Sequence, residues 1–330
     1  MKRETMLLSR SDIQSLIELG EICDIVEATF RDHGLGQVVL PAKISLNIES
    51  VDNQAWMNAM PAYVKTRDAA GIKWAGGFIN NPRDHDLPYV MATIILNDPQ
   101  TGQALAVMDG AHITNCRTGA AAAVCAKHVA RSDSRVVAMI GAGVQARWTL
   151  RALGRYFDIQ QVRVVDKNPE AAEQYIRDMT SELGIRLSSC DSADRAAEGA
   201  DLVFTATTAN AALINDRSIE PGTTVVALGS YQELDDQFSL TADKVIVDSI
   251  EQCTHRGELA HLFEQGLCTE QIFHGEIGEI VAGSKPGRKS SEERILVVPI
   301  GLGSLDVALA KTVWAGALEK GIGGKFSFSD

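Results

Sequence analysis

The sequence predicts an α/β protein in which a Rossmann-type doubly wound parallel sheet is joined to an α+β domain. Three observations support this fold class. The length of 330 residues suggests two domains, at about 100–200 residues per domain. Short β-like runs separated by turn residues fill much of the first third of the chain, and beyond residue 130 strands and helices alternate.

The composition argues against several classes of protein. No apolar run approaches the roughly 18 residues that span a bilayer, and Met1–Arg10 lacks the apolar core of a secretory signal. The formal net charge is −12 and the basic residues are dispersed, so we expect neither a nucleic-acid nor a membrane partner. The six scattered cysteines form no C-x-x-C pair, which favours reduced thiols and a cytoplasmic location.

We also predict no metal site. Cys253, His255, His261 and His274 lie close together in the sequence, but their spacing fits no structural zinc pattern. The segment Gly257–Gln265 within this group has the pattern of a helix.

The first domain begins with a helical pattern over residues 11–33, with Ser11 as its expected cap and Gly20 as an interruption. Strand-like runs follow at Val38–Leu40, Lys43–Leu46, Trp56–Met60, Ala70–Ala75, Tyr89–Leu96 and Ala104–Met108. The turn signal over residues 98–102 lies between two apolar runs and predicts a hairpin. A largely antiparallel sheet is therefore expected.

The second domain begins after an alanine-rich helix predicted at Arg117–Val129. The expected strands are Arg135–Ile140, Gln161–Val165, Leu202–Thr205, Thr224–Ala227 and Lys244–Val247. The expected helices are Gln145–Tyr156, Pro169–Leu183 and, near the end of the chain, Leu305–Leu318. This alternation predicts a parallel sheet covered by helices.

The most specific local motif is G-x-G-x-x-A, which follows the apolar run Val136–Ile140 and precedes a predicted helix. Gly141 permits the tight turn, Gly143 allows the backbone to approach a pyrophosphate, and Ala146 permits close helix–strand packing. The helix N-terminus offers N–H groups and partial positive charge to phosphates. The structural alternative is an ordinary strand–helix turn.

An acidic residue, Asp166, ends the second strand of this βαβ unit. A carboxylate at that place accepts hydrogen bonds from the ribose of NAD and repels the 2′-phosphate of NADP. Lys167 would soften this repulsion, so NAD is predicted and NADP is the alternative. Further cofactor contacts are expected from Val144, Gln145, Thr205, Thr207 and Gly229.

Several segments together resemble the ornithine cyclodeaminase/mu-crystallin family over nearly the whole chain. They are Leu40–Lys43, Met60–Tyr63, Gly71–Lys73, Leu96–Asp98, Thr101–Gly102, Arg117–Ala121, Gly141–Ala146, Asp166 and Gly301–Asp306. The Arg-Thr-x-Ala run just before a Rossmann unit is the distinctive part, because many families share the glycine motif.

The resemblance implies a Rossmann domain inserted into a domain that forms dimers through its sheet. We therefore expect a substrate-binding and dimerisation domain at residues 1–118 and 304–330, and an NAD-binding domain at residues 119–303. The family's chemistry is hydride exchange between nicotinamide and the α-carbon of an amino or imino acid. A small amino or imino acid substrate and a homodimer are thus expected.

The same resemblance implies that Lys43, Lys73 and Arg117 hold the substrate carboxylate, and that Arg117 and Thr118 lie at the cofactor. Charge-assisted donors suit a carboxylate, and arginine offers a bidentate fork. Structural alternatives are a surface lysine for Lys43 and, for Arg117, a helix-start arginine paired with Asp109. Lys73 lies in an apolar strand, where burial would lower its pKa and suit it to donate a proton.

The sequence departs from the cyclodeaminases at two places. Asn58 replaces a glutamate of that subfamily and is expected to contact substrate, and the loop Gly229–Asp235 is shorter, with Tyr231 in place of an aspartate. Both departures favour an imine or ketimine reductase or an amino-acid dehydrogenase, with Lys73 or Tyr231 as the proton donor. Ornithine or lysine cyclodeaminase is the alternative, and a crystallin-like binding protein is the third interpretation.

Overall fold

The computed structural model describes residues 4–48 and 55–328. The chain forms two compact units, one made of Met1–Arg117 with Leu302–Asp330 and the other of Thr118–Gly301. Of the segment Met1–Arg10, in which no secretory signal is expected, the first three residues lie outside the described part. No helix within the described ranges is long and apolar enough to cross a membrane.

The first unit contains a sheet in the order β16-β1-β7-β6-β5-β4-β2, with β3 paired to β4. Its strands are β1 (Glu4–Leu8), β2 (Val38–Val39), β3 (Ile44–Asn47), β4 (Trp56–Val64), β5 (Ala69–Gly77), β6 (Val90–Asn97), β7 (Ala104–Asp109) and β16 (Gly324–Ser327). All pairs are antiparallel except β1 with β7. The predicted hairpin over residues 98–102 is confirmed by the pairing of β6 with β7.

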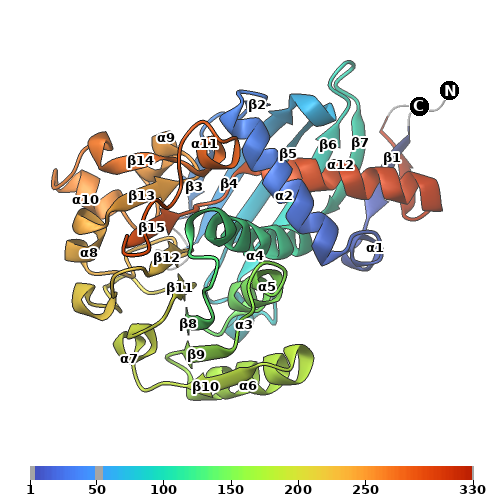
Figure 1. Ribbon diagram of the computed structural model, residues 1–330. Helices are drawn as coiled ribbons and strands as arrows, with labels where there is room; N and C mark the ends of the chain where they lie inside the picture. The colour runs from blue at the N-terminus through green and yellow to red at the C-terminus, as the bar shows by residue number, and fades with distance from the viewer. Residues whose placement is uncertain (1–3, 49–54, 329–330) are drawn as a thin grey trace. The chain divides into compact units, whose positions relative to one another are not determined.

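Helix α12 (Gly303–Lys320) lies across one face of this sheet, and α2 (Leu19–Gly34) packs against α12 (Figure 1). The predicted helix over residues 11–33 is two helices, because the chain breaks between α1 (Arg10–Gln14) and α2. The cap is Ser9 and not Ser11. The Ser9 side chain accepts the N–H of Asp12, and the Asp12 carboxylate accepts the N–H of Ser9.

Helix α4 (Gly110–Val129) begins seven residues before the predicted start at Arg117. The Asp109 carboxylate accepts the N–H of His112 at 2.9 Å and so provides the N-terminal cap that the sequence reasoning missed. Arg117 therefore lies in the interior of the helix and not at its start. A short helix, α3 (Asn81–Asp84), and the 3₁₀ turn η1 (Lys65–Arg67) complete the first unit.

The second unit contains a fully parallel sheet in the order β10-β9-β8-β11-β12-β15-β13-β14. Its strands are β8 (Val136–Ile140), β9 (Gln161–Val165), β10 (Arg186–Ser189), β11 (Leu202–Thr205), β12 (Thr224–Ala227), β13 (Lys244–Val247), β14 (Phe273–Glu276) and β15 (Ile295–Val298). The four strands β11, β12, β15 and β13 are buried along their whole length, as expected for a sheet with both faces covered. The predicted fold class is confirmed.

The helices of this unit connect the parallel strands. They are α5 (Val144–Leu153), α6 (Pro169–Leu183), α7 (Ala193–Ala197), α8 (Asp236–Thr241), α9 (Ile250–Cys253), α10 (Ala260–Glu264) and α11 (Ile277–Val281), with 3₁₀ turns η2 (Asp216–Ser218) and η3 (Glu270–Ile272). Helix α10 is shorter than the predicted Gly257–Gln265, because Gly257 has a φ of +74° outside the helical region. The predicted helix Pro169–Leu183 is confirmed.

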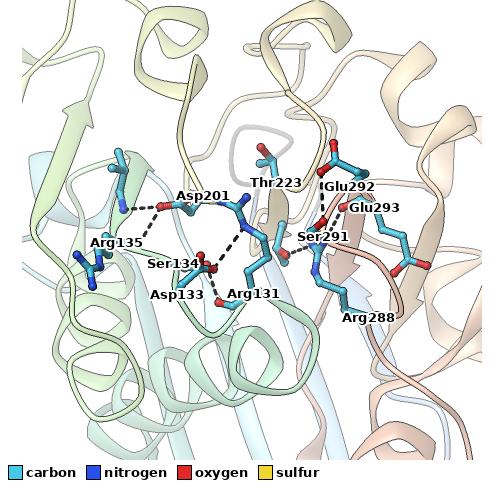
Figure 2. Close-up of polar contacts among 12 residues, drawn as sticks. Arg131, Asp133, Ser134, Arg135, Asp201, Thr223, Arg288, Ser291, Glu292 and Glu293 are labelled. Atoms are coloured by element: carbon cyan, nitrogen blue, oxygen red, sulfur yellow. Dashed lines mark hydrogen bonds and ion pairs between the residues drawn. The ribbon is translucent and has the colours of Figure 1, made fainter.

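The strand order reverses between β8 and β11, and ligands of such sheets bind outside the carboxyl ends of the strands at this point. The amino ends are held by polar contacts, which Figure 2 shows. The Asp201 carboxylate accepts the N–H groups of Arg135 and Val136 at 2.8 and 2.9 Å and pairs with Arg131. Arg288 donates to the carbonyl oxygen of Val129 at 2.9 Å. This edge is therefore structural.

Candidate functional site

The turn between β8 and α5 has the backbone shape that the glycine motif predicts. Gly141 has a φ of +101°, and a Cβ there would lie 2.6 Å from the Ala206 carbonyl oxygen. A Cβ on Gly143 would meet nothing within 4 Å, and α5 begins after Gly143 without a side-chain cap. Ala146 is fully buried, as close packing requires. This helix N-terminus fits a phosphate or pyrophosphate group.

Asp166 supports the same turn. Its Oδ2 accepts the N–H of Ala142 at 2.8 Å and its Oδ1 accepts the N–H of Asn168 at 2.9 Å. The side chain is half-buried, and each carboxylate oxygen has a second lone pair that can accept a further hydrogen bond. Asp166 therefore suits the ribose contact predicted for NAD, while Lys167 beside it is exposed.

Three more predicted cofactor residues lie at the carboxyl ends of β11 and β12. Thr205, Thr207 and Gly229 all donate hydrogen bonds to one buried carboxylate, that of Glu233. Sequence reasoning missed Glu233, because a single glutamate in a polar loop carries no local signal.

In the first unit, two buried cations share one carboxylate. The ammonium Nζ of Lys73, on β5, lies 2.7 Å from Oδ2 of Asp306, and Nε of Arg117, on α4, lies 3.1 Å from Oδ1. All three side chains are nearly or fully buried. The ion pair uses only Nε of Arg117 and so does not occupy the two terminal amino groups of the guanidinium. A fork of this kind suits a carboxylate ligand.

The pKa of Lys73 is lowered from 10.5 to about 7, chiefly by burial and then by the charge of Arg117, with a smaller effect of Lys43, while Asp306 opposes the change. The Lys73 ammonium also lies 3.4 Å from the hydroxyl of Thr114. A proton donor with a pKa near neutrality works most efficiently near neutral pH.

The partner of Arg117 is Asp306 and not Asp109, which instead pairs with Arg10 at 3.5 Å. Asp306 belongs to the segment that carries the family resemblance, but sequence reasoning assigned it no role. A signal was present in the sequence, because a lone acid between Leu305 and Val307 in an apolar helix requires a buried partner.

Asn58 and Lys43 complete the group in the first unit. Asn58 on β4 pairs in register with Ala75 on β5, which places its side chain on the same face of the sheet as Lys73. Its Oδ1 accepts a hydrogen bond from the Ser45 hydroxyl. Lys43 is half-buried just before β3. The structure thus brings Lys43, Asn58, Lys73 and Arg117 together.

The remaining predicted site residues lie in the second unit. Thr118 is half-buried on α4, Val144 and Gln145 begin α5, and Tyr231 is exposed in the loop after β12. Their contacts with cofactor or substrate stay predictions. Within the described ranges, no group of three or more His, Cys, Asp or Glu residues could hold a metal ion.

The fold, the glycine turn with Asp166 and the Lys73–Asp306–Arg117 group define a dinucleotide-binding protein whose second unit is of the Rossmann type and whose first unit carries buried cations. The sequence matches the ornithine cyclodeaminase/mu-crystallin family over residues 3–321, so the chain belongs to that family. It is 38% identical to alanine dehydrogenase of Archaeoglobus fulgidus over 98% of this chain and 99% of that protein.

Two solved structures are similar over almost their full length. Δ(1)-Pyrroline-2-carboxylate reductase of Thermococcus litoralis, in complex with NADH and L-proline, has a TM-score of 0.93 and 35% identity, and covers 97% of this chain and 99% of its own. An archaeal alanine dehydrogenase dimer with bound NAD has a TM-score of 0.93 and 38% identity, and covers 99% and 100%. These relatives confirm the predictions of an enzyme, of NAD as its cofactor and of oxidoreductase chemistry on the C–N bond of amino or imino acids.

We predict that Gly143→Val strongly weakens the affinity for NADH without unfolding the protein. The extended backbone of Gly143 accepts a side chain and a Cβ there meets no atom within 4 Å, so we expect the valine to enter the space that a pyrophosphate requires. The dissociation constant for NADH, measured by fluorescence titration, should rise about tenfold or more, which is about 1.4 kcal/mol or more of binding free energy.

Gly119→Ala is the matched control. A Cβ at Gly119 would lie 2.4 Å from the backbone of Trp148 on α5, so this change should lower the free energy of unfolding by roughly 1–3 kcal/mol. Denaturant unfolding measures this loss. Unchanged NADH affinity in Gly143→Val would contradict the assignment of the turn.

Proposed function

We propose that this protein reduces an α-imino acid to the corresponding α-amino acid with NADH. The observation that carries the proposal is the fully buried Lys73, held against Asp306 beside Arg117, with a pKa of about 7. The substrates that we propose are Δ(1)-pyrroline-2-carboxylate, which gives proline, and the imine of pyruvate and ammonia, which gives alanine. Both share a C=N bond next to a carboxylate.

Arg117 and Lys43 bind the substrate carboxylate in this proposal. The Lys73–Asp306–Arg117 group has two cationic side chains and one anionic one, so a monoanionic substrate neutralises its remaining charge. The terminal amino groups of Arg117 provide the fork, and Asn58 contacts the substrate from the same face of the sheet as Lys73.

Lys73 supplies the proton. When bound, NADH provides the hydride that the imine carbon receives. The imine nitrogen takes one proton from the Lys73 ammonium, the C=N bond becomes a single bond, and neutral Lys73 regains a proton from solvent. Asp306 keeps the ammonium oriented and prevents its pKa from falling below the working range. Tyr231, which is exposed in its loop, is the alternative donor.

Two residues argue against a cyclodeaminase. Cyclodeamination requires acid–base groups for two nitrogen atoms. Asn58 stands where that subfamily has a glutamate, and an amide that accepts a hydrogen bond from Ser45 cannot transfer protons. Tyr231 stands where that subfamily has an aspartate.

The direct test is an assay of NADH oxidation with Δ(1)-pyrroline-2-carboxylate and with pyruvate plus ammonia. We expect stoichiometric loss of nicotinamide absorbance with at least one of them. L-Ornithine and L-lysine are the comparison substrates. Ammonia release from either one without net NADH consumption would instead establish a cyclodeaminase, and tight NADH binding with no turnover of any compound would favour a binding protein.

Replacing Lys73 should remove the alkaline limb of the pH profile, where activity falls as pH rises. Since Lys73 donates its proton in the reductive direction, kcat of the unmodified protein should fall as pH rises through about 7. Lys73→Met should lower kcat by about 10²–10⁴-fold and leave a flat profile, with NADH affinity unchanged.

Lys244→Met is the control for this prediction, because Lys244 is also a buried lysine, paired with Glu293 at 2.8 Å at the structural edge of the second sheet. It should lose stability and keep the pH profile. A profile in Lys73→Met that still falls near pH 7 would rule out Lys73 as the donor.

We also propose a homodimer that forms through the sheet of the first unit. Trp74 on β5 points to the face opposite Lys73 and is exposed. Other apolar side chains on that face are also exposed, and they are Leu7, Ile44, Leu46, Met91 and Phe326. An apolar face of this kind favours association, and the archaeal alanine dehydrogenase is described as a dimer.

Trp74→Glu should convert this dimer into monomers, because it places a charge in the centre of the apolar face. Sedimentation or light scattering at micromolar concentration measures the mass. Leu267→Glu, at an exposed leucine in the other unit, should leave the mass unchanged. A monomeric unmodified protein, or an intact Trp74→Glu dimer, would contradict this interface.

A cytoplasmic location is part of the proposal. The six cysteines are present as thiols in the structure, which a reducing compartment maintains. Cell fractionation followed by immunodetection tests the location, and recovery outside the cytoplasmic fraction would contradict it.

A further inference from the structure

Glu233 is a fully buried carboxylate at the carboxyl ends of β11 and β12. Its Oε2 accepts the Thr205 hydroxyl at 2.7 Å and the Gly229 N–H at 3.0 Å. Its Oε1 accepts both the N–H and the hydroxyl of Thr207, at 2.8 and 2.6 Å. The Thr207 oxygen in turn accepts the N–H of Ala209 at 3.0 Å. One side chain therefore fixes the ends of two neighbouring strands.

This carboxylate is buried without a cation. Among the described residues, the groups that donate to it are uncharged hydroxyl and backbone N–H groups, and burial raises the pKa of its carboxyl group. A second buried carboxyl group, that of Glu258, accepts the N–H groups of Glu233 and Leu234 at 2.7 and 3.0 Å. Burial raises the pKa of Glu258 to about 9, so this second group is neutral at pH 7.

Such an arrangement is costly for stability alone, because an unpaired buried carboxylate loses its hydration. The Glu233 side chain also restricts position 229 to glycine, because a Cβ at Gly229 would lie 2.2 Å from Oε2 of Glu233. The carboxylate at the opposite end of β11, that of Asp201, differs from Glu233 because it has a cation as a partner. There Asp201 accepts two backbone N–H groups but also pairs with Arg131 (Figure 2).

The position of Glu233 relates it to the cofactor. β11 and β12 belong to the half of the sheet beyond the reversal of strand order, whose carboxyl ends receive the second half of a dinucleotide. Thr205 is itself fully buried and its hydroxyl donates to Glu233, so the contribution to the cofactor site that the sequence predicts for Thr205 is here inferred to act through Glu233. Thr207 is only half-buried, and its backbone N–H donates a hydrogen bond to Glu233.

We infer that Glu233 is a positioning residue for the cofactor, which holds Thr207 and the Gly229 loop in the conformation that binds the dinucleotide. Because the inference rests on NADH as the cofactor in the proposed function, failure of the unmodified protein to bind NADH would contradict both. If the unmodified protein binds NADH, the results for the variants below test the role of Glu233 alone.

The test is Glu233→Gln. An amide presents one acceptor oxygen and one NH₂ group, so either Thr207 or Gly229 would face a donor with its own N–H. We expect the dissociation constant for NADH, measured by fluorescence titration, to rise about tenfold, with kcat at saturating NADH and KM for the imino acid nearly unchanged.

Asp201→Asn is the matched control, since it makes the same chemical change at the amino end of the same strand. It should lower the midpoint of thermal unfolding and leave NADH affinity unchanged. Glu233→Gln with a lowered unfolding midpoint and unchanged NADH affinity would overturn the inference and make Glu233 a stabilising residue only.

Thr205→Val decides the question if Glu233→Gln does not fold. The two side chains have the same shape, and the change removes one donor from the Glu233 carboxylate at a fully buried residue. Weaker NADH binding in Thr205→Val, restored in Thr205→Ser, would support the positioning role. Unchanged affinity in Thr205→Val would overturn it.

Discussion

The carboxylate of Asp306 is the group on which the site in the first unit depends. Two cations, Lys73 and Arg117, are buried beside it, and an uncompensated buried charge costs several kcal/mol. With one carboxylate between two cations, a single positive charge remains for an anionic ligand. The same carboxylate keeps the pKa of Lys73 at about 7 against burial and the charge of Arg117. The substrate binding and the proton donation that we propose thus depend on one carboxylate.

Carboxylates have a similar supporting position in the second unit. Asp166 accepts the N–H of Ala142 in the glycine turn, and Glu233 accepts N–H groups of Thr207 and Gly229. In a protein with a net charge of −12, the groups predicted to bind the anionic cofactor are N–H donors and a helix N-terminus. Its carboxylates lie beside those donors and fix the loops that carry them.

The parts of the site that the sequence predicted are local in the chain. The turn at Gly141 and Gly143 needs only a strand, two glycines and a helix, and Lys73 was conspicuous as a lone charge in an apolar strand. The partners were not predictable in this way, because Asp306 is separated from Arg117 by 189 residues. The fold shows the same limit. The hairpin of β6 and β7 was predicted, whereas the pairing of β1 with the distant β16 was not.

The position of Asp306 on α12 has a consequence for the order in which the protein matures. During translation the chain emerges from its amino end, so β5 and α4 are made long before α12, with the whole second unit synthesised between them. Until α12 reaches the sheet, Lys73 and Arg117 have no Asp306 to neutralise them and the apolar face of β4 and β5 lacks its cover. The second unit is continuous in the chain and is therefore free to fold first, and the group that we propose for catalysis is completed last.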